Sequence, residues 1–184
     1  MIKENDMNES ISHIVSYQFK KILPLISSIL LVLFIYIPLS VPLLKYLRPD
    51  VAMVCVYFWT LYRRDLFGPI SVALLGFVAD CFTTLPLGIN MFIFIFTYIM
   101  SITYARFVNT KVFAVGWTGF SVISFIAFFA KWLLISFYYS QFLYFIGILA
   151  SYTSTVLLYP LVVRLNVFVQ NKLISNEEVV YEQG

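Results

Sequence analysis

The chain has 184 residues, of which 61% are hydrophobic and only 11% are charged, and its formal net charge is +3. A water-soluble domain carries about a quarter charged residues, so this composition excludes an ordinary globular domain. Successive apolar runs of roughly twenty residues are typical of membrane-spanning helices. The sequence therefore predicts an all-α, polytopic integral membrane protein.

The apolar runs follow one another with short connections. Residues 1–21 form a polar tail that closes with Lys20-Lys21, and residues 164–184 form a second polar tail with acidic residues near its end. Between the tails, we expect a six-helix transmembrane domain over residues 22–163. Its helices are predicted at about 22–40, 51–62, 66–84, 87–105, 112–137 and 141–163.

The second run is short. Val51–Tyr62 has only twelve residues, or about 18 Å of helix against about 30 Å of hydrocarbon. If it crosses, nine lysines and arginines lie on the side of the N-terminus, and only Lys45 and Arg48 lie on the other. If it does not cross, most of the lysines and arginines lie on the side opposite the N-terminus. The preference for basic residues on the cytoplasmic side therefore favours six spans with both termini in the cytoplasm.

Two charged residues interrupt the apolar runs. Asp80 lies near the end of the third run, and Lys131 lies in the outer part of the fifth. A charge at the centre of a membrane helix costs on the order of 3 kcal/mol, so each needs a structural or functional reason. Asp80 could be a proton relay, a ligand anchor or a polar contact that holds helices together, and we favour the last. Lys131 could pair with Asp80 or extend alone to the interface.

Small residues recur at helical spacing on two runs. Residues three or four apart share a helix face, and small side chains there let helices approach closely. We interpret both stripes as packing surfaces within the bundle rather than as dimer faces. They consist of Ala73, Gly76, Asp80 and Thr83 on the third run, and Gly147, Ser151 and Thr155 on the sixth.

A tight turn, residues 83–88, follows the third run. Pro86 fixes φ, and Gly88 permits a positive φ, so the chain can reverse within few residues. Aromatic residues near the run ends are interpreted as interfacial anchors: Trp59, Tyr62, Trp132, Tyr138 and Tyr139.

Chemistry-bearing motifs are lacking in the sequence. It contains no metal-binding Cys/His cluster, no nucleophile motif, no phosphate-binding glycine loop and no basic stripe for nucleic acid. Cys55 and Cys81 lie within apolar runs and are interpreted as small buried hydrophobic residues. We therefore expect no enzyme activity, no cofactor and no metal.

The segment from Arg48 to Tyr104 resembles the rod-shape-determining membrane protein family MreD. The resemblance rests on an aromatic second helix, a charged turn, a G-x-x-x-D helix and a P-L-G turn, in that order. These are Val56-Tyr57-Phe58-Trp59, Tyr62-Arg63-Arg64-Asp65-Leu66, Leu75-Gly76 with Asp80, and Leu85-Pro86-Leu87-Gly88. The chain departs from relatives at Arg64, where some have proline, and at Asn90.

The resemblance implies a non-enzymatic role in lateral cell-wall elongation in the bacterial cytoplasmic membrane. MreD-like proteins associate with the bitopic protein MreC. Through it they associate with the actin-like MreB and with peptidoglycan synthases, namely RodA and its class B penicillin-binding partner. On this chain the structural or partner-binding candidates are Gly76, Asp80, Pro86 and Gly88 in the hairpin, with Trp59, Arg63 and Lys131 outside it. Either the hairpin or the aromatic second helix would face MreC.

A second interpretation belongs to a different functional class. Six helices with short loops also describe the substrate-binding membrane subunits of energy-coupling vitamin transporters, which MreD resembles in architecture. In that case Asp80 and Lys131 would contact a small ligand near the outer surface. The order and spacing of the family pattern favour the wall-elongation role.

Overall fold

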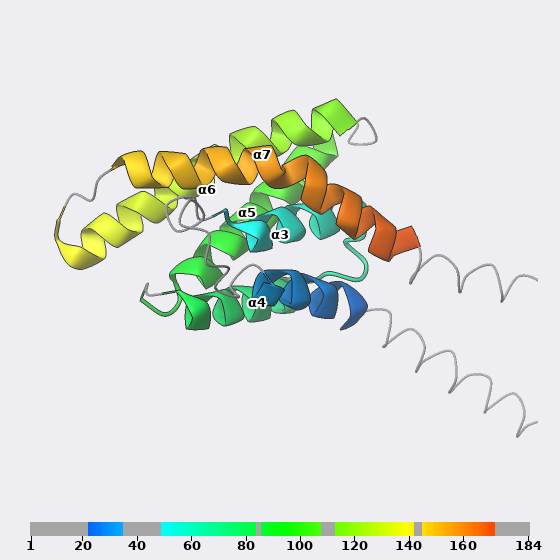
Figure 1. Ribbon diagram of the computed structural model, residues 1–184, viewed down its shortest axis with the longest axis horizontal. Helices are drawn as coiled ribbons and strands as arrows, with labels where there is room; N and C mark the ends of the chain where they lie inside the picture. Colours follow the sequence, from blue (N-terminus) through cyan, green and yellow to red (C-terminus); the bar gives the residue numbers. More distant parts are fainter. Residues whose placement is uncertain (1–21, 35–48, 84–85, 108–112, 142–144, 172–184) are drawn as a thin grey trace, which may run out of the picture.

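The structure is a computed structural model that describes residues 22–34, 49–83, 86–107, 113–141 and 145–171. Within these ranges the chain is all-α, with six helices (Figure 1). They are Ile22–Phe34, α3 (Val51–Tyr62), α4 (Pro69–Phe82), α5 (Ile89–Phe107), α6 (Phe113–Tyr139) and α7 (Phe145–Val169). The helices α5, α6 and α7 are long and apolar enough to cross a membrane, and the other three are shorter apolar helices. These features indicate a multi-pass membrane protein.

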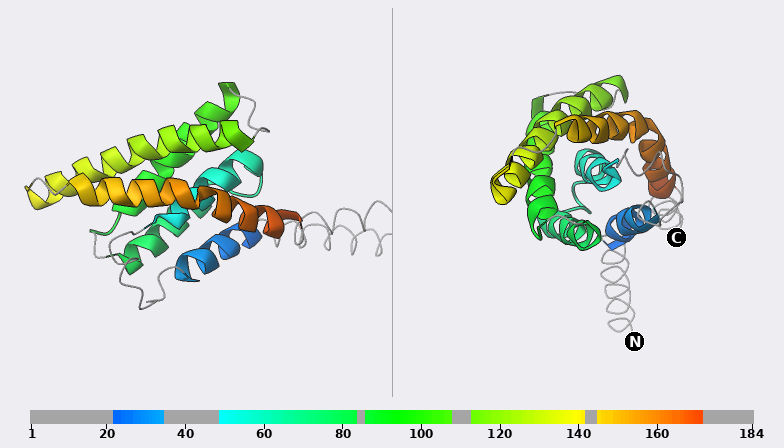
Figure 2. Two further views of the ribbon diagram at one scale, coloured as in Figure 1. Left: turned by 45° about the horizontal axis from the view of Figure 1, so that its top comes forward. Right: turned by 60° about the vertical axis from the view of Figure 1, so that its left-hand side comes forward.

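The shortest labelled helix, α3, lies at the centre of the bundle. Figure 2 shows α3 enclosed by the other helices, and every residue from Val51 to Thr60 is buried. Its sequence is compatible with this position, because a helix that is apolar on all sides has no polar face that needs water. Asp50 caps its first turn by accepting a hydrogen bond from the Met53 amide at 3.2 Å.

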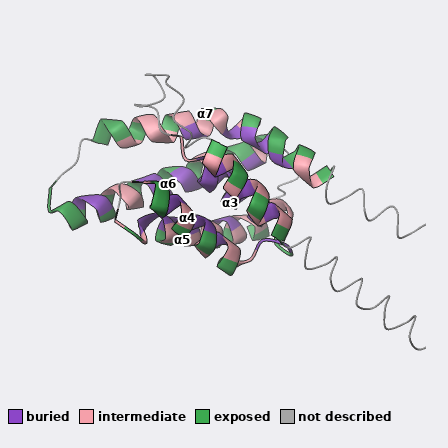
Figure 3. Cartoon of the chain, turned by 60° about the horizontal axis from the view of Figure 1, so that its bottom comes forward, coloured by how far each residue is buried: buried purple, intermediate pink, exposed green. Residues whose placement is uncertain are grey.

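The remaining helices wind around α3 in chain order. Contacts join α4 to α5, α5 to α6 and α6 to α7, while α5 and α7 make the most extensive contacts with α3. The outer helices carry exposed residues along their outward sides (Figure 3). On α4 this exposed stripe is apolar and includes Ile70, Leu74 and Phe77, as expected of a surface that faces lipid.

The helix boundaries differ from the predicted ones mainly in the second half of the chain. The helix α6 continues to Tyr139, and the turn falls at Ser140, whose φ is 51°. The helix α7 runs on to Val169 with Pro160 inside it, six residues beyond the predicted end of the sixth helix at residue 163. The extension persists because Val162, Val163 and Asn166 are buried against the bundle.

In the first half of the chain, the helix boundaries agree more closely with the predicted ones. The helix α3 has the predicted bounds, and α4 begins at Pro69 because Gly68 forms its N-cap and proline fits a first turn. The predicted N-terminal tail 1–21, residues 172–184 of the predicted C-terminal tail and residues 35–40 of the first predicted helix lie outside the described residues.

Candidate functional site

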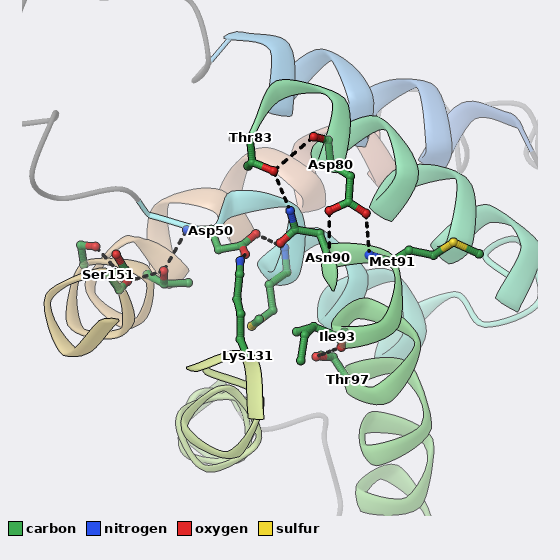
Figure 4. A network of polar contacts seen from close by, with 12 residues as sticks. Asp50, Asp80, Thr83, Asn90, Met91, Ile93, Thr97, Lys131 and Ser151 are labelled. Atoms are coloured by element: carbon green, nitrogen blue, oxygen red, sulfur yellow. Dashed lines mark hydrogen bonds and ion pairs between the residues drawn. The ribbon is translucent and has the colours of Figure 1, made fainter. Parts of the chain in front are cut away.

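The Asp80 carboxylate holds the start of α5. The residue is 1% exposed. Its Oδ2 accepts hydrogen bonds from the Gly88 amide at 2.9 Å and the Met91 amide at 3.3 Å, and its Oδ1 accepts from the Asn90 amide at 3.0 Å (Figure 4). The first amides of a helix have no partner within the helix and carry its positive dipole end. Asp80 therefore supplies both the acceptors and the negative charge that this helix end needs.

Two further side chains complete this hairpin. Asn90 Nδ2 donates to Thr83 Oγ1 at 3.2 Å, and Thr83 Oγ1 donates to the Asp80 carbonyl at 3.2 Å. Gly88 has a φ of +100°, which L side chains rarely adopt. The predicted stripe on α4 thus ends in a hydrogen-bonded turn, and Asp80 acts as a contact between helices.

Gly76 allows α4 and α5 to approach closely. A Cβ atom at this position would overlap the Met91 Cα and lie 2.9 Å from the Met91 amide nitrogen, which are backbone atoms of α5. A backbone atom cannot move aside as a side chain can. The glycine therefore sets the spacing that lets Asp80, one turn further along α4, reach the first amides of α5.

We expect Gly76→Ala to lower the free energy of unfolding by about 1–3 kcal/mol, because the added methyl overpacks a tight contact. Resistance of the purified protein to unfolding in mixed detergent measures the change. Gly147→Ala is the matched control, since nothing lies within 4 Å of the added atom, and we expect it to be neutral or slightly stabilising. Equal effects of the two substitutions would contradict the close contact at Gly76.

A second polar junction joins α3, α6 and α7. Lys131 Nζ on α6 lies 3.2 Å from Asp50 Oδ2, and the two side chains are 13% and 14% exposed. The Asp50 amide donates to Thr155 Oγ1 on α7 at 2.9 Å, and that hydroxyl donates to the Ser151 carbonyl at 2.6 Å. An ion pair, a helix cap and a side-chain hydrogen bond therefore meet at the start of the central helix (Figure 4).

This junction lies inside the bundle. Lys131 is eight residues from the end of α6, or about 12 Å, and Thr155 is ten residues from the start of α7, or about 15 Å. Figure 1 shows α6 and α7 extending past α3 at this end. The N-terminus of α3 consequently begins below the tip of the α6–α7 hairpin, which explains why Asp50 is shielded.

The structure corrects the expected partner of Lys131. Lys131 neither pairs with Asp80 nor extends alone to the interface, because it contacts Asp50. The acceptor atoms of Asp80 are engaged by the amides of α5. Sequence reasoning placed Asp50 in a loop and missed it, although an aspartate directly before an apolar run is a typical N-cap signal.

The structure places the other predicted residues in different surroundings. Trp59 is fully buried, so its prediction as an interfacial anchor is wrong. Because it lies on the all-apolar helix α3, it packs inside the bundle, where its ring meets Phe58 edge-on at 5.2 Å. Arg63 Nε lies 3.4 Å from Asp65 Oδ1 in the α3–α4 turn. Pro86 is half-buried in the hairpin turn, where its carbonyl accepts from the Ile89 amide at 3.4 Å.

The remaining predicted residues differ in how far they are buried. Tyr138 and Tyr139 are exposed at the end of α6, which is compatible with an interfacial position. Gly147, at the start of the second small-residue stripe, has no neighbour within 4 Å of an added Cβ, whereas Thr155 at its end is buried. Of the cysteines, Cys55 is buried and Cys81 is exposed, so the prediction that Cys81 is a buried hydrophobic residue is wrong.

Tyrosine hydroxyls attach the start of α6 to α3 and α5, a feature that sequence reasoning missed. Tyr57 Oη donates to the Gly116 carbonyl and Tyr104 Oη donates to the Val115 carbonyl, both at 2.9 Å. The ring of Tyr104 also lies over Gly119, where a Cβ would overlap it. Glycines three residues apart on α6 were the available signal for this close packing.

No protein-family model, curated protein or solved structure matches the chain. Its function must therefore be inferred from its own residues and their geometry.

Proposed function

We propose that this chain is a non-enzymatic membrane component of the bacterial cell-wall elongation machinery, with the role of an MreD-like protein. The observation that carries the proposal is the α4–α5 hairpin. Gly76, Asp80 and Gly88, which belong to the family pattern, are also the residues that build this hairpin through close packing, amide capping and a positive φ. The three positions are separate in the sequence, but one structural role explains them, because each residue helps to form the same hairpin.

The proposed topology has six spans, with both termini in the cytoplasm and the chain in the bacterial cytoplasmic membrane. The distribution of lysine and arginine supports this orientation. The short helix α3 contributes the second span, and the burial of its first ten residues supports this assignment, because a helix shielded from lipid need not match the hydrocarbon thickness.

Within this role, the chain holds MreC and, through it, MreB, RodA and the class B penicillin-binding protein. The buried state of α3 favours the hairpin over the aromatic second helix as the MreC-facing surface, because Trp59 and its neighbours have no exposed surface to offer. At the hairpin, Leu87 is 71% exposed. A large exposed apolar side chain beside a hydrogen-bonded turn is suited to a protein contact.

The experiment is a pull-down of the tagged full-length chain from its native membrane in nanodiscs, followed by mass spectrometry. Recovery of an MreC-like protein together with wall synthases supports the proposal. Recovery of a paired ATPase with its coupling subunit, or of a bound vitamin, contradicts it and favours the transporter class. That class has less support here, because α3 fills the centre of the described bundle.

We expect Leu87→Asn to reduce recovery of the MreC-like protein about tenfold, which corresponds to the loss of one interface hot spot. The matched control is Leu157→Asn, since Leu157 is similarly exposed on α7 at 67% and lies outside the hairpin. Equal recovery with both variants would exclude the hairpin as the contact surface, even if the protein class proved correct.

A further inference from the structure

We propose that the end of the bundle where α3, α5 and α7 finish binds anionic phospholipid headgroups through Arg64, Arg106 and Arg164. This inference concerns the lipid around the chain and does not depend on the proposed function.

The charges of the described residues are divided between the two ends of the bundle. Arg63 and Arg64 follow α3, Arg106 is in the last turn of α5, and Arg164 is near the end of α7. The ends of α3 and α7 lie on the same side of the molecule in Figure 1. The fifth described basic residue, Lys131, is engaged by Asp50 in the interior.

Within the part of the chain that the structure describes, acidic side chains do not neutralise this end. Asp65 is the acidic residue that the described chain places there, and it pairs with Arg63. The other described aspartates, Asp50 and Asp80, are held by contacts at the starts of α3 and α5. Among the described residues, Arg64, Arg106 and Arg164 therefore present exposed guanidinium groups without an acidic partner.

The surroundings of the arginines favour lipid over an acidic protein segment. Arg106 adjoins Phe107, which is 83% exposed, and Arg164 lies one turn before Phe168, which is 60% exposed. A basic group beside an exposed aromatic side chain fits the headgroup boundary of a bilayer, where the ring enters the acyl region. The three arginines also come from separate elements, so headgroups spread around the chain can meet all of them.

Arginine suits the phosphate chemistry of these headgroups. Its planar guanidinium donates two parallel hydrogen bonds to phosphate oxygens. Each basic residue near an anionic surface contributes about fivefold in binding, equivalent to ~1 kcal/mol. Neutral phosphatidylcholine carries the same phosphate together with a cationic group, so net charge distinguishes the two lipids.

The test uses the intrinsic fluorescence of Trp117, which is 39% exposed in the first turns of α6. Trp59 is shielded from lipid, and Trp132→Phe removes the signal from the far part of α6. The full chain is reconstituted in equal mixtures of phosphatidylglycerol and phosphatidylcholine, with bromine on the acyl chains of one lipid at a time. We expect brominated phosphatidylglycerol to quench several-fold more strongly at low salt, and the difference to shrink as salt screens the charges.

The variants decide the assignment. Arg64→Gln, Arg106→Gln and Arg164→Gln combined should abolish the preference, whereas the three Arg→Lys changes, which preserve charge and control for folding, should retain most of it. Equal quenching by both lipids at low salt would overturn the proposal. A preference that survives the triple Gln change would also overturn it. Equal quenching by both lipids, together with loss of a protein partner from the Gln variant in native membranes, would also overturn it. That outcome would show that this end of the bundle binds an acidic protein.

Discussion

Replacing Asp80 by leucine is expected to lower the free energy of unfolding by about 3–6 kcal/mol, because a buried hydrogen-bond donor that loses its acceptor costs about 1–3 kcal/mol. The carboxylate accepts from the amides of Gly88, Asn90 and Met91. Leucine is apolar and of similar length, so the change removes the acceptor atoms and the charge while keeping a side chain of similar size. Asp80→Asn should cost less, since one carbonyl oxygen remains while the helix end loses its compensating charge.

Resistance to unfolding in mixed detergent measures the effect, and proteolysis at the hairpin shows where it acts. Asp65→Asn is the matched control, because the Asp65 side chain is 55% exposed and a surface ion pair contributes little. If Asp80→Leu proved as stable as Asp65→Asn, the hydrogen bonds from α5 could not be what holds the hairpin. Proteolysis confined to α6 and α7 would argue against the same assignment.

The helices were predictable from the sequence because each one is a long or clearly bounded apolar run. The helix α3 has the predicted bounds, since Asp50 precedes its apolar run and Arg63-Arg64-Asp65 follows it. Further along the chain, tertiary contacts overrode local signals. The buried Val162, Val163 and Asn166 carry α7 past Pro160 and Arg164, where proline and charge suggested an end.

The arrangement of the helices was not predictable in the same way. Every run is apolar, so hydropathy does not tell which helix lies inside the bundle and which faces lipid. Trp59 illustrates this, because aromatic residues near a helix end commonly mark an interface, yet here every residue from Val51 to Thr60 is buried. The sequence does contain a partial signal for the cap at Asp80, since an acid six residues before a P-L-G reversal lies close to the next helix start.

The partner of Lys131 depended on helix length. If every helix had spanned the bilayer fully, Asp50 would have lain in water beyond the bilayer, out of reach of Lys131. Because α3 has only twelve residues, its N-terminus lies below the tip of α6 and α7. The ion pair is thus a consequence of a short helix enclosed by longer ones.

Removing one charge of the Asp50–Lys131 ion pair should destabilise the protein more than removing both charges. We expect Lys131→Met to lower the free energy of unfolding by about 3–5 kcal/mol, because it leaves a shielded carboxylate without its cation. Asp50→Asn should also destabilise, since it leaves the ammonium group uncompensated. Asparagine caps a helix as well as aspartate does, so the cap on the Met53 amide is preserved in this variant.

The double variant Asp50→Asn/Lys131→Met should recover most of the lost stability, to within about 1–2 kcal/mol of the natural chain, because neither charge remains buried and methionine fills the space of the lysine stem. Unfolding of all four proteins in the same detergent series gives the interaction energy directly. Losses that simply add in the double variant would mean that Asp50 and Lys131 act independently. A coupled result would show that paired charge ties the central helix to α6. Because the Asp50 amide also donates to Thr155 on α7, polar contacts that lipid cannot replace hold the start of α3 at its depth in the bundle.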